Sequence, residues 1–308
     1  MKGWVTEPMN HTTNGLRGAI ALFMAAFIWG IAFVAQSKGG EAMGAFTFNA
    51  TRFVMGGFVL IPLILFFRSR EAGAQGAPLP LRSGIVIGCA LAIASMLQQV
   101  GITMGAAAGK AGFLTACYIV LVPILGILLG KKCPAKVWLA VLITLVGLYL
   151  LCIKDSFSLS RPDILLLLCA LCFSIQILCI GIFAPGTDAI ELSCIEFLTC
   201  GILSAVPALI CEVIPHPQQT LASFATADAW IPLLYAGICS TGIAYTLQVV
   251  GQASVHPTIA SLLMSLESVF SVLAGWVLLH EHLTLREGIG CALIFLAVVI
   301  AQRGENDF

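Results

Sequence analysis

Three charged side chains lie within stretches that are otherwise apolar enough to cross a membrane: Arg52, Glu196 and Glu267. Only 10% of the chain is charged, so each of these positions is an exception. A charge at bilayer depth costs about 2.5 to 3.5 kcal/mol on insertion scales, and it is usually kept where it faces a water-filled cavity or another polar group. These three residues are therefore the first candidates for binding a polar solute or moving a proton.

The three positions differ in depth. Glu267 lies about ten residues from either end of its apolar stretch, which favours a role in lining a pathway or coupling it to protons. Arg52 and Glu196 lie nearer the ends of theirs, where a long side chain can reach the interface or pair with a neighbour. For these two, a structural role and a role in the pathway both stay open.

Uncharged polar residues repeat at helical spacing in the same apolar stretches. Ser95 and Gln98 are three apart, as are Tyr245 and Gln248, so each pair shares one helix face. Converging faces of this kind would form a hydrated cavity, although such side chains also bond simply to a neighbouring helix. The candidates for the cavity wall are Gln98, Thr115, Tyr118, Tyr245, Gln248 and Ser265.

Composition sets the class of protein that must position these residues. With 59% hydrophobic residues, 308 residues cannot all be hidden in one soluble core, so the lipid bilayer is the expected surroundings. The net charge is +0 and no basic block occurs, which argues against nucleic acid as a partner. No Gly-rich turn precedes Lys-Ser or Lys-Thr, so the chain carries no sign of an ATP-driven pump.

Ten stretches are each near the roughly 20 residues that a helix needs to span hydrocarbon. The sequence therefore predicts an all-α polytopic protein with ten transmembrane helices, joined mostly by short connections, with solvated loops around 68–82 and 214–229. The predicted spans are 17–37, 45–67, 83–104, 110–130, 135–153, 162–183, 191–213, 230–250, 257–279 and 285–302.

The two halves of the chain resemble each other. Shifted by 150 positions, the segment 95–101 falls on 245–251, and shifted by 144, Arg52-Phe53 falls on Glu196-Phe197. This predicts a first repeat at 17–153 and a second at 162–302. Five helices is an odd number, so the second copy must enter the membrane from the opposite side. Inverted repeats of this kind build carriers with alternating access.

Several tracts are similar to those of a known family. They are Phe27-Ile28-Trp29-Gly30, Arg52, Ala111-Gly112-Phe113-Leu114-Thr115 with Val122-Pro123, and Ser265-Leu266-Glu267 with Gly275 and Glu281. In this order they resemble the two repeats of the EamA family of the drug/metabolite transporter superfamily. The resemblance implies a ten-helix secondary carrier for small metabolites or drugs, often working outward. Ser268 and Lys131 depart from the family, which often has Pro and an acidic residue there.

Lys and Arg near the helix ends predict the orientation, because cytoplasmic loops are enriched in them. They favour the side that holds both termini, so we expect a multi-pass protein of the cell inner (plasma) membrane with cytoplasmic termini. The basic residues assigned to this side are Lys2, Arg17, Arg68, Arg70, Arg82, Lys131, Lys132, Lys136 and Arg303.

No metal or other cofactor is expected. Cys169 and Cys172 form a CxxC inside an apolar run with no second pair, and His280-Glu281-His282 sits at a helix end where its side chains spread apart.

The function expected is secondary transport of a small-molecule substrate, a polar metabolite, amino acid-like compound or drug, in the export direction. The alternatives are an integral-membrane lipid-modifying enzyme and a membrane partner that transports nothing. The sequence leaves proton coupling and a homodimer open.

Overall fold

The computed structural model describes residues 11–70, 79–106, 108–153, 160–278 and 284–303, and all regular secondary structure in these ranges is helical. Nine helices in them are long and apolar enough to cross a membrane, and a shorter apolar helical stretch, Pro257–Leu273, adds a tenth. Many large apolar side chains are exposed on the outside, among them Leu65, Leu139 and Val206. An apolar exterior is what lipid contact requires, so the chain is an all-α, multi-pass membrane protein.

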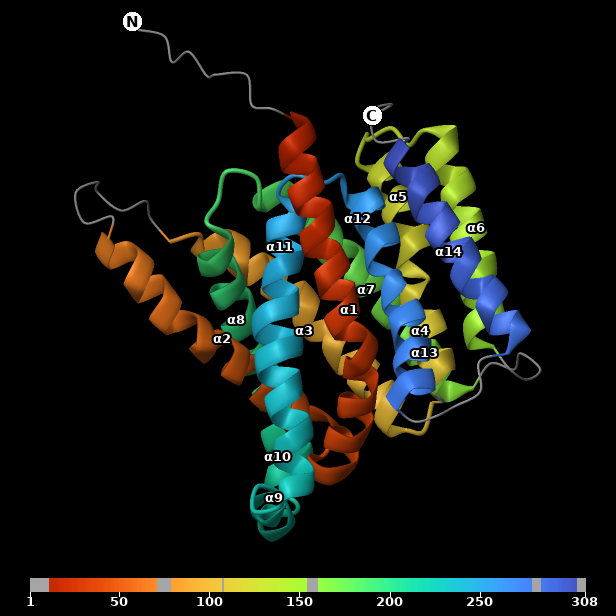
Figure 1. Cartoon of the computed structure of the whole chain (residues 1–308). Helices are drawn as coiled ribbons and strands as arrows, with labels where there is room; N and C mark the ends of the chain where they lie inside the picture. The colour runs from red at the N-terminus through yellow and green to blue at the C-terminus, as the bar shows by residue number, and fades with distance from the viewer. Residues whose placement is uncertain (1–10, 71–78, 107, 154–159, 279–283, 304–308) are drawn as a thin grey trace, which may run out of the picture.

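The described helices divide between the two repeats, and the second repeat has more separate elements than the first (Figure 1). The first contains α1 (His11–Met43), α2 (Ala45–Arg70), α3 (Leu81–Thr103), α4 (Ala108–Ala116), α5 (Tyr118–Leu128) and α6 (Ala135–Cys152). The second contains α7 (Arg161–Phe183), α8 (Ala189–Ala208), η1 (Leu209–Val213), α9 (Pro217–Ser223), α10 (Ala227–Leu234), η2 (Tyr235–Tyr245), α11 (Thr246–Gln252), α12 (Pro257–Met264), α13 (Leu266–Leu278) and α14 (Leu285–Arg303).

The fourth and ninth predicted spans, 110–130 and 257–279, are each two helices rather than one. The first break falls at Cys117, whose backbone N–H donates to Leu114 O, three residues back. The second falls at Ser265, where the N–H of Ser268 donates to Ser265 O in the same way. These bonds tighten one turn of each helix, and a tightened turn ends the regular α pattern. Hydropathy cannot detect such a break, because apolar residues continue through it.

Two other expectations need correction. The first span was expected to end at residue 37, before Gly39 and Gly40, but α1 continues to Met43. A Cβ on Gly39 would lie 2.0 Å from the ring of Phe48, so this glycine allows close packing and does not end the helix. The turn comes at Gly44, where φ is +89°. The stretch 214–229, expected to be a loop, contains α9, which begins at a proline that favours a first helical position.

The two repeats are joined by helices packed across them. In Figure 1, α2 and α8 lie together on one side of the molecule and α6 and α14 on the other. Glycines bring the second pair into backbone contact: a Cβ on Gly290 would lie 2.7 Å from Gly147 O, and a Cβ on Gly147 would lie 2.9 Å from Gly290 O. Small residues at such crossings increase van der Waals contact, which is a main source of helix association in lipid.

Polar contacts hold the two ends of the α2–α8 pair. At one end, the Glu212 carboxylate accepts hydrogen bonds from the N–H of Phe46 at 3.0 Å and from the N–H and hydroxyl of Thr47, both at 2.7 Å. At the other end, Arg68 Nε lies 2.5 Å from Glu191 Oε1. The shift of 144 residues that aligns Arg52 with Glu196 also aligns Arg68 with Glu212 and Thr47 with Glu191. The two contacts are therefore equivalent positions of the two repeats, built with different chemistry.

We predict that Glu212→Ala destabilises the protein by about 1 to 2 kcal/mol, because the first turn of α2 loses a carboxylate that satisfies its free N–H groups. The measurement is reversible unfolding of purified protein in mixed detergent micelles. Glu41→Ala, a change at an exposed glutamate near the end of α1, is the matched control and should have little effect. Equal stability of Glu212→Ala and wild type would contradict the prediction.

Candidate functional site

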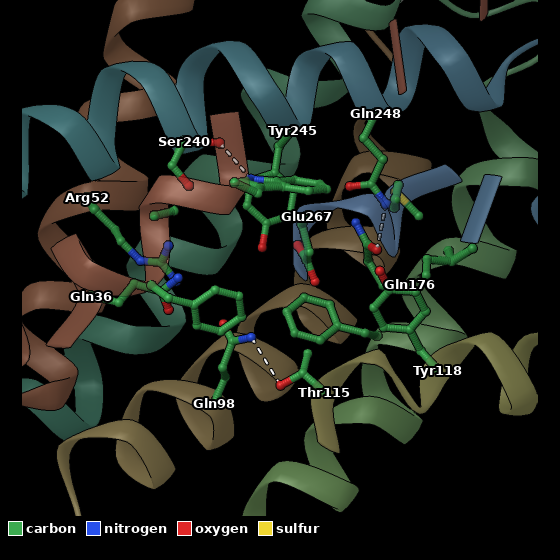
Figure 2. Close-up of a pocket in the computed structure, with 16 residues that line it drawn as sticks. Gln36, Arg52, Gln98, Thr115, Tyr118, Gln176, Ser240, Tyr245, Gln248 and Glu267 are labelled. Atoms are coloured by element: carbon green, nitrogen blue, oxygen red, sulfur yellow. Dashed lines mark hydrogen bonds between the residues drawn. The ribbon is translucent and has the colours of Figure 1, made fainter. Parts of the chain in front are cut away.

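A cavity of about 500 Å³ lies between the helices, and Figure 2 shows the side chains that line it. Eight come from each repeat, so neither half forms the site alone. The first repeat contributes Trp29, Ala32, Phe33, Gln36, Arg52, Gln98, Thr115 and Tyr118. The second contributes Phe173, Gln176, Ile177, Ser240, Tyr245, Gln248, Met264 and Glu267.

The duplication recurs in the wall of the cavity. Gln98 and Gln248, which the shift of 150 residues relates, both line it. Three further pairs are related by the shift of 144 residues: Trp29 with Phe173, Ala32 with Gln176, and Phe33 with Ile177. Equivalent faces of the two repeats therefore meet at one place, as expected where a pseudo-twofold axis passes through a binding site.

Arg52 is buried, with 1% of its surface exposed, and does not reach the membrane interface. Its Nε and Nη2 donate to Asn49 Oδ1 at 3.1 and 2.8 Å, and its guanidinium carbon lies 4.5 Å from the centre of the Phe53 ring. Asn49 is held in turn by the hydroxyls of Ser95 and Ser204, each at 3.0 Å. These contacts fix a cation in the wall of the cavity.

Glu267 lies in the first turn of α13, directly after the break at Ser265, and is 7% exposed. In Figure 2 it is drawn between Arg52 on one side and Gln248 on the other. Within the described part of the chain, no Lys, Arg or His nitrogen lies within 4.0 Å of its carboxylate. The interruption of the helix thus places a carboxyl group at the cavity, where none of the described residues forms an ion pair with it.

Glu196 is fully buried behind the cavity wall and does not line the cavity. Gln176 Nε2 donates to Glu196 Oε1 at 2.9 Å, while Gln176 Oε1 accepts from Gln248 Nε2 at 3.3 Å. Gln248 Nε2 also donates to Gln252 Oε1 at 3.0 Å. Glu196 therefore reaches the cavity only through a chain of amide side chains.

Most of the remaining predicted residues meet at the cavity. Gln98 Nε2 donates to Thr115 Oγ1 at 3.4 Å, and Tyr118 lies beside Gln176 in the view of Figure 2. The Tyr245 ring packs edge-on against Trp29 with centroids 4.7 Å apart. Ser265 alone of this group lies outside the cavity lining, because its hydroxyl donates to Leu262 O of its own helix at 2.7 Å.

Irregular backbone borders the cavity. Ser240 and Tyr245 belong to η2, an 11-residue π-helix, and the Trp29 indole N–H donates to Ser240 O at 3.2 Å. Thr115 and Tyr118 flank the break at Cys117, while Met264 and Glu267 flank the break at Ser265. Backbone that leaves the α pattern within a membrane is tolerated where it is enclosed by protein or lines a cavity, and it is frequent at functional sites.

In the described ranges, no three His, Cys, Asp or Glu side chains gather as a metal site would require. Cys169 is buried and Cys172 half-buried, and neither is in a disulfide. The tract His280-Glu281-His282, along with the expected family residue Glu281 within it, lies outside the described residues.

Comparison with protein families decides the relationship. The model of the EamA-like transporter family matches residues 16–153 and again residues 160–302. The chain belongs to this family. EamA proteins are part of the drug/metabolite transporter superfamily, so the chain is a membrane transporter with a small-molecule substrate.

Relatives of this EamA protein carry similarly broad names. A protein of Archaeoglobus fulgidus called an uncharacterized transporter is 29% identical over 92% of this chain and 85% of its own length. The uncharacterized transporter YoaV of Bacillus subtilis is 21% identical over 89% of this chain and 93% of its own. A crystal structure with 20% identity has a TM-score of 0.75 and covers 96% of this chain and 98% of its own, which supports the fold.

Sequence reasoning missed three polar residues of this EamA cavity: Gln36, Gln176 and Ser240. Gln36 lies one residue before the expected end of the first span, where polar side chains are common, so its position gave no indication of a cavity. Gln176 aligns with Ala32 of the first repeat, so the repeat comparison gave it no support. Its polarity within an apolar span was the one available indication. The sequence gave no indication that Ser240 lines a cavity, because a serine within a helix often bonds only to its own backbone.

We predict that Gln176→Leu lowers the free energy of unfolding of the EamA protein by about 1 to 3 kcal/mol, because Glu196 and Gln248 each lose a buried partner. A double-mutant cycle with Glu196→Gln, measured by unfolding in mixed micelles, should show a coupling of roughly 0.5 to 3 kcal/mol. Gln219→Leu in exposed α9 is the matched control. Additive effects of the two changes would contradict the network.

Proposed function

We propose that this EamA protein is a secondary active transporter that moves a small polar solute by alternating access. One observation carries the proposal: a single polar cavity is lined equally by two repeats, with equivalent residues of each repeat facing it. Rocking of one half against the other around such a site exposes it to each side in turn. A lipid-modifying enzyme or a partner without transport has no need of this arrangement.

In this proposal Glu267 is the residue that couples transport to protons. Its support is positional, since a carboxyl group borders the cavity at a helix break and has no cation within ion-pairing distance among the described residues. A carboxyl group in such a place can bind a proton when the cavity faces one side and release it to the other. Arg52, Gln98, Thr115, Tyr118, Tyr245 and Gln248 are proposed to contact the solute. Glu196 and Ser265 act, in this proposal, by supporting the wall.

We further propose a location in the cytoplasmic (inner) membrane with both termini in the cytoplasm, and transport in the outward direction. The orientation is supported by the basic residues near helix ends on the side of the termini, including Arg17, Lys131 and Lys132. The direction is supported by family membership, because such carriers often work outward.

We predict that Glu267→Gln abolishes the dependence of transport on pH, because an amide cannot exchange a proton in this range. A thermal-shift screen of a metabolite library against purified protein first supplies the solute, since a specific ligand stabilises the folded state by mass action. Its uptake into proteoliposomes is then measured from about pH 5 to about pH 8, a range that spans the titration of perturbed carboxyl groups.

Glu41→Gln, the same change at an exposed glutamate, is the control and should keep the wild-type pH profile. A wild-type profile in Glu267→Gln would contradict the coupling role while leaving transport intact. Absence of uptake by every form, despite binding, would contradict the transport proposal itself.

We predict that a fluorescent protein fused after residue 308 fluoresces when the chain is expressed in a bacterial inner membrane, because such fusions mature only in the cytoplasm. An alkaline phosphatase fusion at the same point should be inactive. A second pair of fusions within 184–188, between α7 and α8, lies on the same predicted side and serves as an internal check. Active phosphatase at the terminus would contradict the orientation.

A further inference from the structure

Arg52 presents a cation to the cavity that no carboxylate of the described residues neutralises. A guanidinium has five N–H donors, and the two bonds from Nε and Nη2 both go to one oxygen, Asn49 Oδ1. No Asp or Glu oxygen of the described ranges lies within 4.0 Å of its nitrogens. An arginine buried without a counter-charge is costly, unless an anion or water in the cavity satisfies the remaining N–H groups.

Two acceptors of the same cavity also lack partners. Gln36 Oε1 and Gln248 Oε1 are buried, and neither accepts a hydrogen bond from any described residue. The amide nitrogen of Gln248 is already engaged with Gln176 and Gln252, so the network holds its oxygen in a fixed place. A buried acceptor without a donor costs about 1 to 3 kcal/mol, and a ligand that brings N–H or O–H groups would satisfy it.

Aromatic and other apolar side chains form a further part of the wall. Trp29, Phe33, Phe173 and Tyr245 line the cavity together with Met264. These side chains offer an apolar surface to the body of a ligand, while Arg52 and the glutamine oxygens meet its polar groups. The cavity thus favours a molecule with one anionic end, donor groups and an apolar remainder.

We propose that Arg52 anchors the carboxylate of the transported solute, and that the solute is a small monocarboxylate that also carries hydrogen-bond donors. This inference rests on the proposed transport function and adds the chemical class of its substrate. Guanidinium binds carboxylate through paired N–H···O bonds, which gives both affinity and orientation. A phosphate group is disfavoured, because its second negative charge would share the cavity with Glu267.

Two matched series of probes test the proposal. The first consists of leucine, its hydroxy-acid analogue, isocaproate and leucinamide; the second consists of phenylalanine, phenyllactate, phenylpropionate and phenylalaninamide. Each series keeps one apolar body and removes either the donor group or the carboxylate. Binding to purified full-length protein is measured by calorimetry, and solute exchange is measured in proteoliposomes.

In at least one series we expect the amino acid or the hydroxy acid to bind roughly tenfold or more tightly than the amide, because the amide has no negative charge and only one acceptor oxygen for the paired N–H groups of the guanidinium. The acid without a donor group should bind more weakly than its amino or hydroxy analogue. In Arg52→Met the preference for acid over amide should disappear. Arg52→Lys keeps the positive charge but loses the paired N–H groups of the guanidinium, so it should retain part of the preference for acid over amide.

Arg303→Met makes the same substitution at the exposed end of α14 and should leave the preference unchanged. If Arg52→Met does not fold, the proposal is tested by the preference for acid over amide in Arg52→Lys and in the wild type. Equal binding of acid and amide by wild type, an unchanged preference in either Arg52 variant, or binding of no acid from either series would overturn the inference. Transport of a neutral solute that persists in Arg52→Met would also overturn it, and would leave alternating-access transport standing.

Discussion

The cost of an unsatisfied polar group in hydrocarbon governs how this molecule is built. No water is present there, so each buried donor, acceptor or charge must find its partner within the protein or in a hydrated cavity. Asn49 and its serine partners hold Arg52, and a chain of glutamines reaches Glu196. The first network crosses between the repeats, because Asn49 belongs to α2 and Ser204 to α8, whereas the glutamine chain lies within the second repeat. The polar groups that remain without protein partners include two oxygens in the cavity wall.

The same constraint explains where the backbone departs from a regular helix. A break in a helix leaves N–H and C=O groups without their usual partners, and in lipid such groups must be enclosed by protein or face a cavity. Here η2 and the break at Ser265 border one cavity, and the break at Cys117 lies between two residues that line it. The breaks at Cys117 and Ser265 occur in corresponding helices of the two repeats. The duplication has therefore conserved an interruption as well as a sequence.

Much of this fold follows from the sequence, because span length and repeat symmetry are long-range properties that single residues hardly disturb. The ten-helix class and the positions of the spans agree with the structure to within a few residues in most cases. Of the nine site residues predicted from the sequence, seven line the cavity, since polar side chains in apolar helices are forced toward one another. Glu196 does not line the cavity, because Gln176 lies between Glu196 and the cavity. Ser265 does not line it either, because its hydroxyl donates to the backbone oxygen of Leu262. These outcomes depend on side-chain rotation, which spacing alone does not determine.

The unequal ends of the α2–α8 pair have a further consequence. An ion pair with an arginine that is 39% exposed is weakened by dissolved salt, whereas a carboxylate bonded to the N–H groups of a helix end is less sensitive to salt. Ionic strength therefore acts on one end of this helix pair more than on the other. Two repeats related by near-symmetry are therefore held together by different chemistry at the two ends of this helix pair, and salt weakens one of the two contacts more than the other.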